Sequence, residues 1–319
     1  MRKIIILSII IVAIVCSGII ILYLKSQTSC KISPEYLNGL QRTELINREL
    51  SSNQYNMPVG IVALGLSGTD KNWTIYTNSV LGVANISQLN GVSTIGYNHS
   101  GSSLQLNAIL YSCINDVQKV YWLQDVARFD QYTNKLEFVE NIWNFSNSKD
   151  IPSNTPISDN QSKSILYELP LNLSLLINVS NGVHNTTVNF YYGIYNEASK
   201  HWNYMLYKRV NTNNTPRSRI VIAPAITPAN TYYDSEFVFA GPGSKSIEYF
   251  SVLNAHLSLF YLNSTSGNYV TFPEYFTKGL DTGEVSYNLK STILKDQAIV
   301  KTNMPSVSTG NVVAVNSSN

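Results

Sequence analysis

The sequence is poor in charge. Only 13% of its 319 residues are charged, with 22 Lys and Arg against 20 Asp and Glu, about half the share of an average globular protein. The basic residues form no cluster, so we expect no nucleic-acid partner. Because ionised carboxylates lose their stabilising interactions in acid, a fold with few of them suits an acidic milieu. The alternative interpretation is a Ser-, Thr-, Asn- and Tyr-rich cell-surface protein.

The motifs of several enzyme classes are also missing. The chain contains no HExxH, no GxSxG and no CxxC sequence, so zinc hydrolases, α/β-hydrolases and CxxC redox proteins receive no support. Its four histidines lie far apart in the sequence, on predicted turns or strand starts: His99, His184, His201 and His256. We therefore expect no metal and no cofactor. Carboxylates remain as candidates for hydrolytic chemistry.

The N-terminus predicts export. Arg2 and Lys3 precede an uncharged run from Ile4 to Leu24, which at about 1.5 Å per residue spans the roughly 30 Å of a bilayer's hydrocarbon layer. We interpret residues 1–25 as an uncleaved transmembrane anchor, with a cleaved signal peptide as the alternative. Positive charge before the run places the N-terminus in the cytoplasm. The rest lies outside the cell, either attached to the membrane or secreted.

Glycosylation sequons agree with export, because N-linked glycans are added to exported chains. Asn-x-Ser/Thr begins at Asn72, Asn85, Asn98, Asn144, Asn160, Asn172, Asn178, Asn185, Asn213, Asn263 and Asn316. Outside a cell, Cys30 and Cys113 either form a disulfide or stay free, and the sequence leaves both open.

Most of the chain has the residue pattern of a β-protein. Residues 26–56 predict a stalk or pro-segment, with Ser33 and Pro34 starting one helix over 34–50. After Met57, short runs rich in Val, Ile, Tyr, Thr and Phe alternate with Asn/Gly/Ser turns such as 130–134. This pattern predicts an all-β fold of two sandwich-like domains. We place the parts at 57–145 (β domain 1), 146–163 (linker), 164–298 (β domain 2) and 299–319 (tail).

Strand periodicity assigns polar residues to faces, because residues i and i+2 point the same way. Glu140 shares a face with apolar residues of 135–145, where burial would raise its pKa; the alternative is a strand edge open to solvent. Gln124 lies among apolar residues of 118–129 and needs hydrogen-bond partners. It could hold a water or an oxyanion, as the Gln of a Gln–Glu pair does in glutamic proteases, or tie strands together.

Two more carboxylates are close in sequence. Asp234 and Glu236 point to one face of a strand that runs into Gly241-Pro242-Gly243, with Cα atoms roughly 7 Å apart. Two carboxyls that close can share a proton, as a general acid–base pair requires. An exposed acidic strand edge is the alternative. Asp281-Thr282-Gly283 spells the catalytic turn of pepsin-like proteases, but it occurs once and follows no hydrophobic strand. Glu284 is the other acid of this loop.

Six segments, in order, resemble the thermopsin family of archaeal acid endopeptidases: 57-MPVGIVALG-65, 103-SLQLNAIL-110, 121-YWLQDV-126, 138-FVENIWN-144, 233-YDSEFVFAGPGS-244 and 281-DTGEVS-286. The resemblance implies peptide hydrolysis at acid pH, with polypeptide substrates and without a metal. This chain has Asp125 where the family usually has Asn, and Glu140 where it usually has Asp. Ser244-Lys245 stand where further glycines are common.

These observations give a hypothesis and its rival. We expect an exported, glycosylated acid endopeptidase in which Glu236 or Asp234 works with Glu284 or Glu140, one carboxyl ionised and one protonated. The rival is a non-catalytic glycosylated surface, adhesion or envelope protein on the same β scaffold. The sequence does not indicate an oligomeric state.

Overall fold

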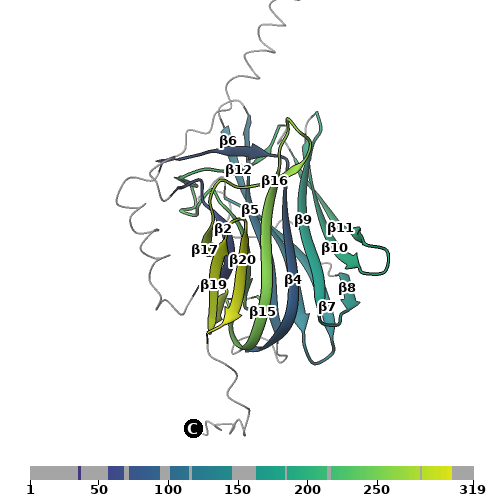
Figure 1. The fold of residues 1–319 in the computed structure, drawn as a ribbon. Coiled ribbons are helices and arrows are strands. Elements are labelled where there is room, and N and C mark those ends of the chain that lie inside the picture. The colour runs from purple at the N-terminus through teal and green to yellow at the C-terminus, as the bar shows by residue number, and fades with distance from the viewer. Residues whose placement is uncertain are drawn as a thin grey trace, which may run out of the picture.

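The computed structural model describes residues 35–36, 57–67, 72–93, 101–114, 117–145, 163–183, 185–213, 217–243, 245–280 and 282–303. All regular structure within these ranges is β-strand, which confirms the all-β prediction. Two nine-stranded sheets, almost entirely antiparallel, dominate the molecule, and Figure 1 shows them stacked face to face.

The strands of the front sheet, which faces the reader in Figure 1, follow in their order across it. They are β11 (His201–Asn213), β10 (Asn185–Asn196), β9 (Leu171–Asn181), β4 (Ser79–Ser93), β15 (Ile247–Leu262), β20 (Gln297–Thr302) and β19 (Leu289–Leu294). β16 (Tyr269–Thr271) and β18 (Val285–Tyr287) also pair with β15, and β18 does so in parallel.

The back sheet lies behind it. Its strands in order are β17 (Phe276–Lys278), β2 (Val59–Ala63), β14 (Ser235–Ala240), β5 (Gly101–Ile114), β6 (Val117–Asp130), β7 (Lys135–Asn144) and β8 (Lys163–Leu166). β12 (Arg219–Ile222) joins β5 and pairs with β3 (Ile75–Thr77). Apart from the sheets, β1 (Glu35–Tyr36) pairs with β13 (Ala225–Ile226).

Each sheet contains strands from both halves of the chain. β4, from the first half, pairs with β9 and β15 of the second half in the front sheet. β14, from the second half, lies between β2 and β5 of the first half in the back sheet. The boundary predicted at 146–163 therefore does not separate the two sheets. A period-2 pattern indicates a strand. It does not indicate which distant strand pairs with it, because that pairing leaves no signal in the local sequence.

The inner faces of the two sheets form the main core. Phe237 and Leu106 of the back sheet and Leu173 and Leu257 of the front sheet are fully buried in it. The sheets approach closely at Gly82, where a Cβ atom would lie 2.6 Å from the ring of Phe237. The alternating apolar pattern of the strands thus places one residue in two between the sheets.

The outer face of the back sheet is covered as well. One apolar cluster includes Ile109, Trp122 and Tyr233, and a second includes Val62 and Val238. A sheet buried on both faces has room for polar side chains only where they bind one another.

Several predictions fall on residues outside the described ranges. These are the anchor 1–25, nearly all of the linker 146–163, most of the tail 299–319, and the Cys30 and Cys113 side chains. Of the predicted stalk helix, only Glu35 and Tyr36 are described, and they form β1. Among the described residues there is no helix long and apolar enough to cross a membrane.

Candidate active site

A row of polar side chains crosses the outer face of the back sheet. Glu236 of β14 pairs with Asn107 of β5, Asn107 with Gln124 of β6, and Gln124 with Asn141 of β7. Because residues directly opposite one another in a sheet point to the same side, these four side chains form one continuous line, called here the polar row. It runs between the two outer apolar clusters.

Glu236 is the buried end of this row. Its carboxyl is fully buried and accepts hydrogen bonds from the backbone N–H of Leu280 and from Asn107 Nδ2, the latter at 3.3 Å. The segment over it is close, since a Cβ at Gly279 would lie 3.1 Å from Glu236 Oε2. Burial disfavours the ionised form of a carboxyl, whereas hydrogen-bond donors aimed at its oxygens favour that form.

Gln124 is held by amides on both sides. Its Nε2 donates to Gln105 Oε1 at 3.0 Å, and its Oε1 accepts from Asn141 Nδ2 at 3.2 Å. Gln105 in turn donates to Ser103 Oγ at 2.9 Å, and Ser103 donates to the carbonyl of Gly241 at 2.7 Å. The network therefore extends from the polar row to the Gly-Pro-Gly turn and fixes the Gln124 side chain.

Asn107 lies between the Glu236 carboxyl and Gln124 in the strand register. Its Nδ2 is used by Glu236, while its buried Oδ1 has no hydrogen-bond donor among the described residues. An unfilled acceptor beside a carboxyl is a place for a water molecule or a substrate N–H. The row approaches solvent at its other end, where Asn141 is partly exposed.

The remaining predicted acids of this region lie close by in the chain. Asp234 immediately precedes β14 and is fully buried. Glu284 is half-buried and accepts hydrogen bonds from Thr282 Oγ1 and from the backbone N–H of Lys245. These bonds hold Glu284 to its own loop and to the turn before β15. Asp281 lies outside the described residues.

Glu140 lies on the opposite face of the same sheet. It pairs with Asp125, which pairs with Leu106 of the inner face, and both carboxyls are fully buried between the sheets. Glu140 and Glu236 therefore lie on opposite faces of the sheet, and the structure does not bring this predicted pair together. Alternation had correctly placed Glu140 among apolar residues. It did not show which face of β14 matches which face of β7.

A bulge in β11 supplies partners for the inner pair. The register with β10 skips Tyr207, so that Tyr207 and the next residue, Lys208, both reach inward. Tyr207 Oη donates to Asp125 Oδ1 at 2.8 Å, and Lys208 Nζ lies 3.4 Å from Glu140 Oε1. Burial raises the pKa of Asp125 well above its ordinary value; the Tyr207 hydrogen bond opposes this rise and the charge of Glu140 adds to it.

Sequence reasoning missed Asn107, Gln105, Tyr207 and Lys208. The first two were visible in 103–110, where polar residues alternate with Leu104, Leu106 and Ala108. The other two depend on a bulge, which leaves no sequence signal. Within the described ranges, no three His, Cys, Asp or Glu residues come together as a metal site would require.

Comparison with known proteins agrees with the resemblance. The thermopsin family model matches residues 44–289 of this chain. Thermopsin from Sulfolobus acidocaldarius is 28% identical over 265 residues, which cover 74% of this chain and 76% of that protein. The residues matched by the family model include every residue of the polar row.

Proposed function

Because the chain belongs to the thermopsin family, and is on that ground a peptide hydrolase of thermopsin type, we propose that it is an exported acid endopeptidase whose acid–base group is Glu236. The observation that carries this proposal is the register that aligns Glu236, Asn107 and Gln124 on one face. Glu236 and Gln124 lie on either side of Asn107. A carboxyl can activate a water molecule by taking its proton, and a side-chain amide can stabilise an oxyanion by donating a hydrogen bond.

The proposed reaction proceeds in two steps. Glu236, ionised, takes a proton from a water held near Asn107 Oδ1 while the water oxygen attacks the peptide carbonyl. Gln124 donates an N–H to the oxyanion that forms. Glu236 then gives the proton to the amide nitrogen as the C–N bond breaks, which leaves a carboxylic acid and an amine. Asp234, two residues earlier, is the second carboxyl in a two-carboxyl version of this mechanism.

Access to Glu236 requires movement. Its carboxyl is fully buried under Gly279 and Leu280, so this segment has to shift before a polypeptide reaches it. We propose that residues 1–25 export and anchor the protein and that some of its sequons carry glycans. Low overall charge supports an acidic working environment.

The test is digestion of casein and of a denatured globular substrate by the full-length chain from pH 1 to 7. Glu236→Gln should lower the rate at least ~100-fold, the scale of general acid–base catalysis, with an unchanged circular dichroism spectrum. The matched control is Glu137→Gln, because Glu137 lies on the same face of the same sheet and pairs with Arg128 instead. It should keep full activity.

Two further variants separate the versions of the mechanism. Gln124→Ala should lower kcat about 100-fold. Asp234→Asn should remove the acid limb of the pH profile if two carboxyls act, and leave it in place if Glu236 acts alone. Full activity of folded Glu236→Gln would refute the proposal. No cleavage by the folded wild-type chain at any pH would favour the non-catalytic surface protein.

A further inference from the structure

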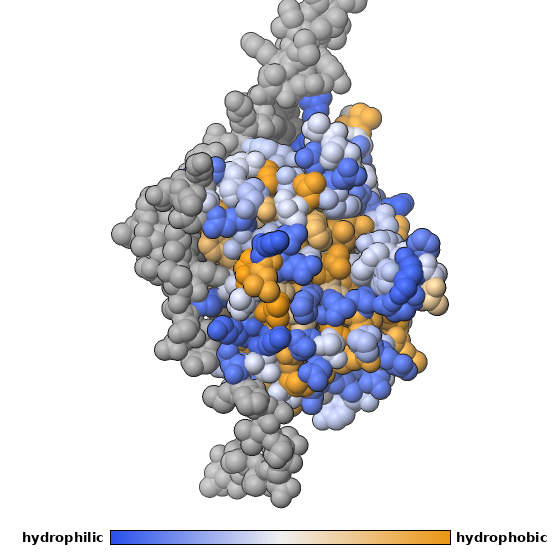
Figure 2. All heavy atoms as spheres, in the orientation of Figure 1, coloured by the Kyte–Doolittle hydropathy of each residue, from blue (hydrophilic) through white to orange (hydrophobic). Residues whose placement is uncertain are grey.

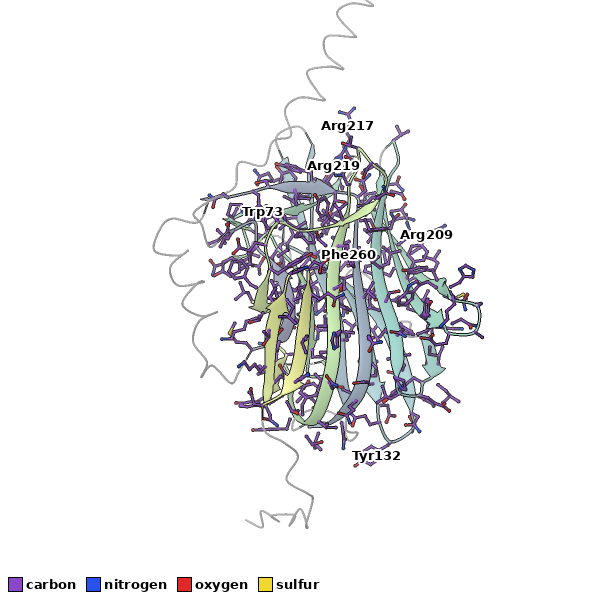
Figure 3. All side chains as sticks on the ribbon, viewed as in Figure 1. Trp73, Tyr132, Arg209, Arg217, Arg219 and Phe260 are labelled. Atoms are coloured by element: carbon purple, nitrogen blue, oxygen red, sulfur yellow. The ribbon has the colours of Figure 1, made fainter. Side chains whose placement is uncertain are left out.

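The outer face of the front sheet carries apolar and aromatic side chains that are exposed to solvent. Phe260, Leu81, Leu176, Tyr191 and Leu206 lie opposite one another, one from each of five neighbouring strands. Each is at least partly exposed, and Leu206 is 40% exposed. Figure 2 shows apolar residues gathered over this face, and Figure 3 places Phe260 near its middle.

Three rings at one end of this face are arranged as a platform. Tyr195 pairs with Trp202, and their ring centroids are 5.4 Å apart with the planes at 60°, edge to face. The Trp202 and Tyr204 centroids are 6.1 Å apart with an angle of 32° between the planes, so these two rings supply the flatter surface. Tyr204 pairs with Gly193, where a Cβ would lie 2.8 Å from Tyr204 Cε1. The Tyr204 ring thus lies over the glycine, in the space that a Cβ would need. Tyr204 is 41% exposed.

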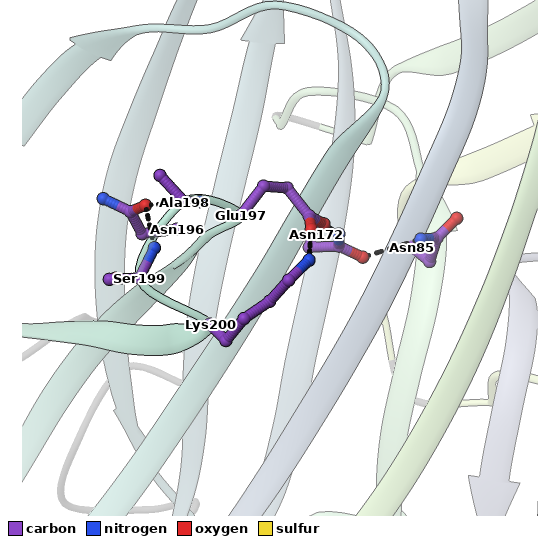
Figure 4. Close-up of polar contacts among 7 residues, drawn as sticks. All are labelled: Asn85, Asn172, Asn196, Glu197, Ala198, Ser199 and Lys200. Carbon is purple, nitrogen blue, oxygen red and sulfur yellow. Dashed lines mark hydrogen bonds and ion pairs between the residues drawn. The ribbon is translucent and has the colours of Figure 1, made fainter.

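Polar groups lie on the strands and the turn next to the platform, and Figure 4 shows the contacts among them. Asn85 Nδ2 donates to Asn172 Oδ1 at 2.7 Å, and Asn172 Nδ2 donates to Glu197 Oε1 at 3.1 Å. Lys200 Nζ donates to Glu197 Oε2 at 2.7 Å, so the two charges of this border neutralise each other. Glu197 and Lys200 lie in the turn that joins the strands carrying Tyr195 and Trp202.

This combination points to one class of ligand. An anion would need a cation at this border that is not already paired. An apolar partner would remove the border amides and the Glu197–Lys200 charges from water without offering them hydrogen bonds. A sugar ring satisfies both parts, because its C–H face stacks on an aromatic ring while its hydroxyl groups bind amides and carboxylates. We propose that Tyr195, Trp202 and Tyr204, with the Asn85–Asn172–Glu197–Lys200 border, bind a neutral oligosaccharide.

The oligosaccharide belongs to a polysaccharide that is not attached to this chain. The site lies on the front sheet, whereas the polar row lies on the outer face of the back sheet, so saccharide binding does not depend on the proposed proteolysis. Asn85 and Asn172 each begin a sequon, and a glycan attached there would reach the same rings. The test therefore needs protein made in a host that does not glycosylate it.

The experiment is affinity electrophoresis of the full-length chain through gels containing soluble neutral polysaccharides: hydroxyethylcellulose, starch, galactomannan or laminarin. At least one should retard the wild-type chain. Trp202→Ala and Tyr204→Ala should each weaken the retardation at least tenfold at an unchanged thermal midpoint, and Trp202→Phe should retain part of it. Tyr132→Ala is the matched control, since Tyr132 is 74% exposed in the turn between β6 and β7 of the back sheet (Figure 3).

Three results would overturn the proposal. The first is no retardation by any of the polysaccharides. The second is equal retardation of wild type and Trp202→Ala. The third is Trp202-dependent dimerisation, or sedimentation with neutral phosphatidylcholine vesicles, in the absence of polysaccharide binding. Retardation of the glycan-free chain that is absent from the glycosylated chain would assign the platform to the protein's own glycan and overturn the external source.

Discussion

Asp125 and Glu140 lie directly opposite each other on β6 and β7, fully buried between the sheets. They are also the two positions at which the resemblance to the thermopsin family implies other residues, Asn and Asp. The two departures therefore occur at one place in space, where Tyr207 and Lys208 bind the carboxyls. A buried carboxyl pair with one nearby cation is most stable with one proton and one negative charge.

Asp125→Asn should make the protein less sensitive to rising pH. The folded-state pKa of Asp125 lies well above its ordinary value, so its contribution to stability is complete below about pH 4 and declines as pH rises toward the folded pKa. The amide still accepts the Tyr207 hydrogen bond. Urea unfolding from pH 3 to 8 should give equal midpoints in acid and a higher midpoint for the variant near pH 7. If the urea midpoints of the wild type and of Asp125→Asn changed with pH in the same way, Asp125 would not be the group that titrates.

Lys208→Met should destabilise the protein most at neutral pH. It leaves Glu140 buried without its ammonium partner, which typically costs about 3 kcal/mol, and less at pH 3, where the carboxyl can take up a proton. Guanidinium unfolding at both pH values measures the difference. Lys200→Met is the control, because the Lys200–Glu197 pair is exposed, and it should have no measurable effect. If Lys208→Met lowered the free energy of unfolding equally at both pH values, loss of the ion pair would not be the cause.

The sequence predicted what depends on local pattern. Period-2 alternation placed Glu140 among apolar residues and Gln124 among Trp122 and Val126, and both are buried as expected. The turn at 130–134 is also present, with Asp130 Oδ1 accepting the backbone N–H of Tyr132. Pairing between distant strands is different, because it depends on the whole sheet. Hence the sequence did not show that Asn107 lies between Glu236 and Gln124, nor that the sheet separates Glu140 from Glu236.

Glu248→Gln should stabilise the protein at neutral pH. Burial raises the pKa of Glu248 from 4.5 to about 9, and its carboxyl oxygens have no hydrogen-bond partner among the described residues. Stability from this group is complete below pH 4.5 and is lost as pH rises through about 9. At pH 7 the gain should be on the order of 3 kcal/mol, with no gain at pH 4.

Thermal unfolding between pH 3 and 9 checks this prediction. Glu168→Gln is the control, because Glu168 is exposed, and its profile should follow that of the wild type. A Glu248→Gln profile with the wild-type slope would show that the carboxyl is not the group that titrates. Together, Asp125 and Glu248 predict a protein that is more stable in acid than at neutral pH, which is the condition proposed for its activity.

Gly279→Ala should lower proteolysis without unfolding the protein. The added Cβ would lie 3.1 Å from Glu236 Oε2 and 3.1 Å from Pro58 Cβ, so either the carboxyl or the segment above it has to move. Because Leu280 N–H binds the same carboxyl, we expect kcat to fall about tenfold or more, since small misplacements of catalytic groups are costly. The thermal midpoint should change by only a few degrees.

The matched control for Gly279→Ala lies in the same loop. At Gly283 an added Cβ would meet only the flexible Lys245 side chain, at 3.1 Å, so Gly283→Ala should keep kcat and KM near their wild-type values. Equal losses in the two variants would mean that loop flexibility, and not the position of Glu236, limits the reaction. Full activity in Gly279→Ala would argue that catalysis does not use the Glu236 carboxyl in this position. The two glycines thus separate an effect on the polar row from an effect on the loop that covers it.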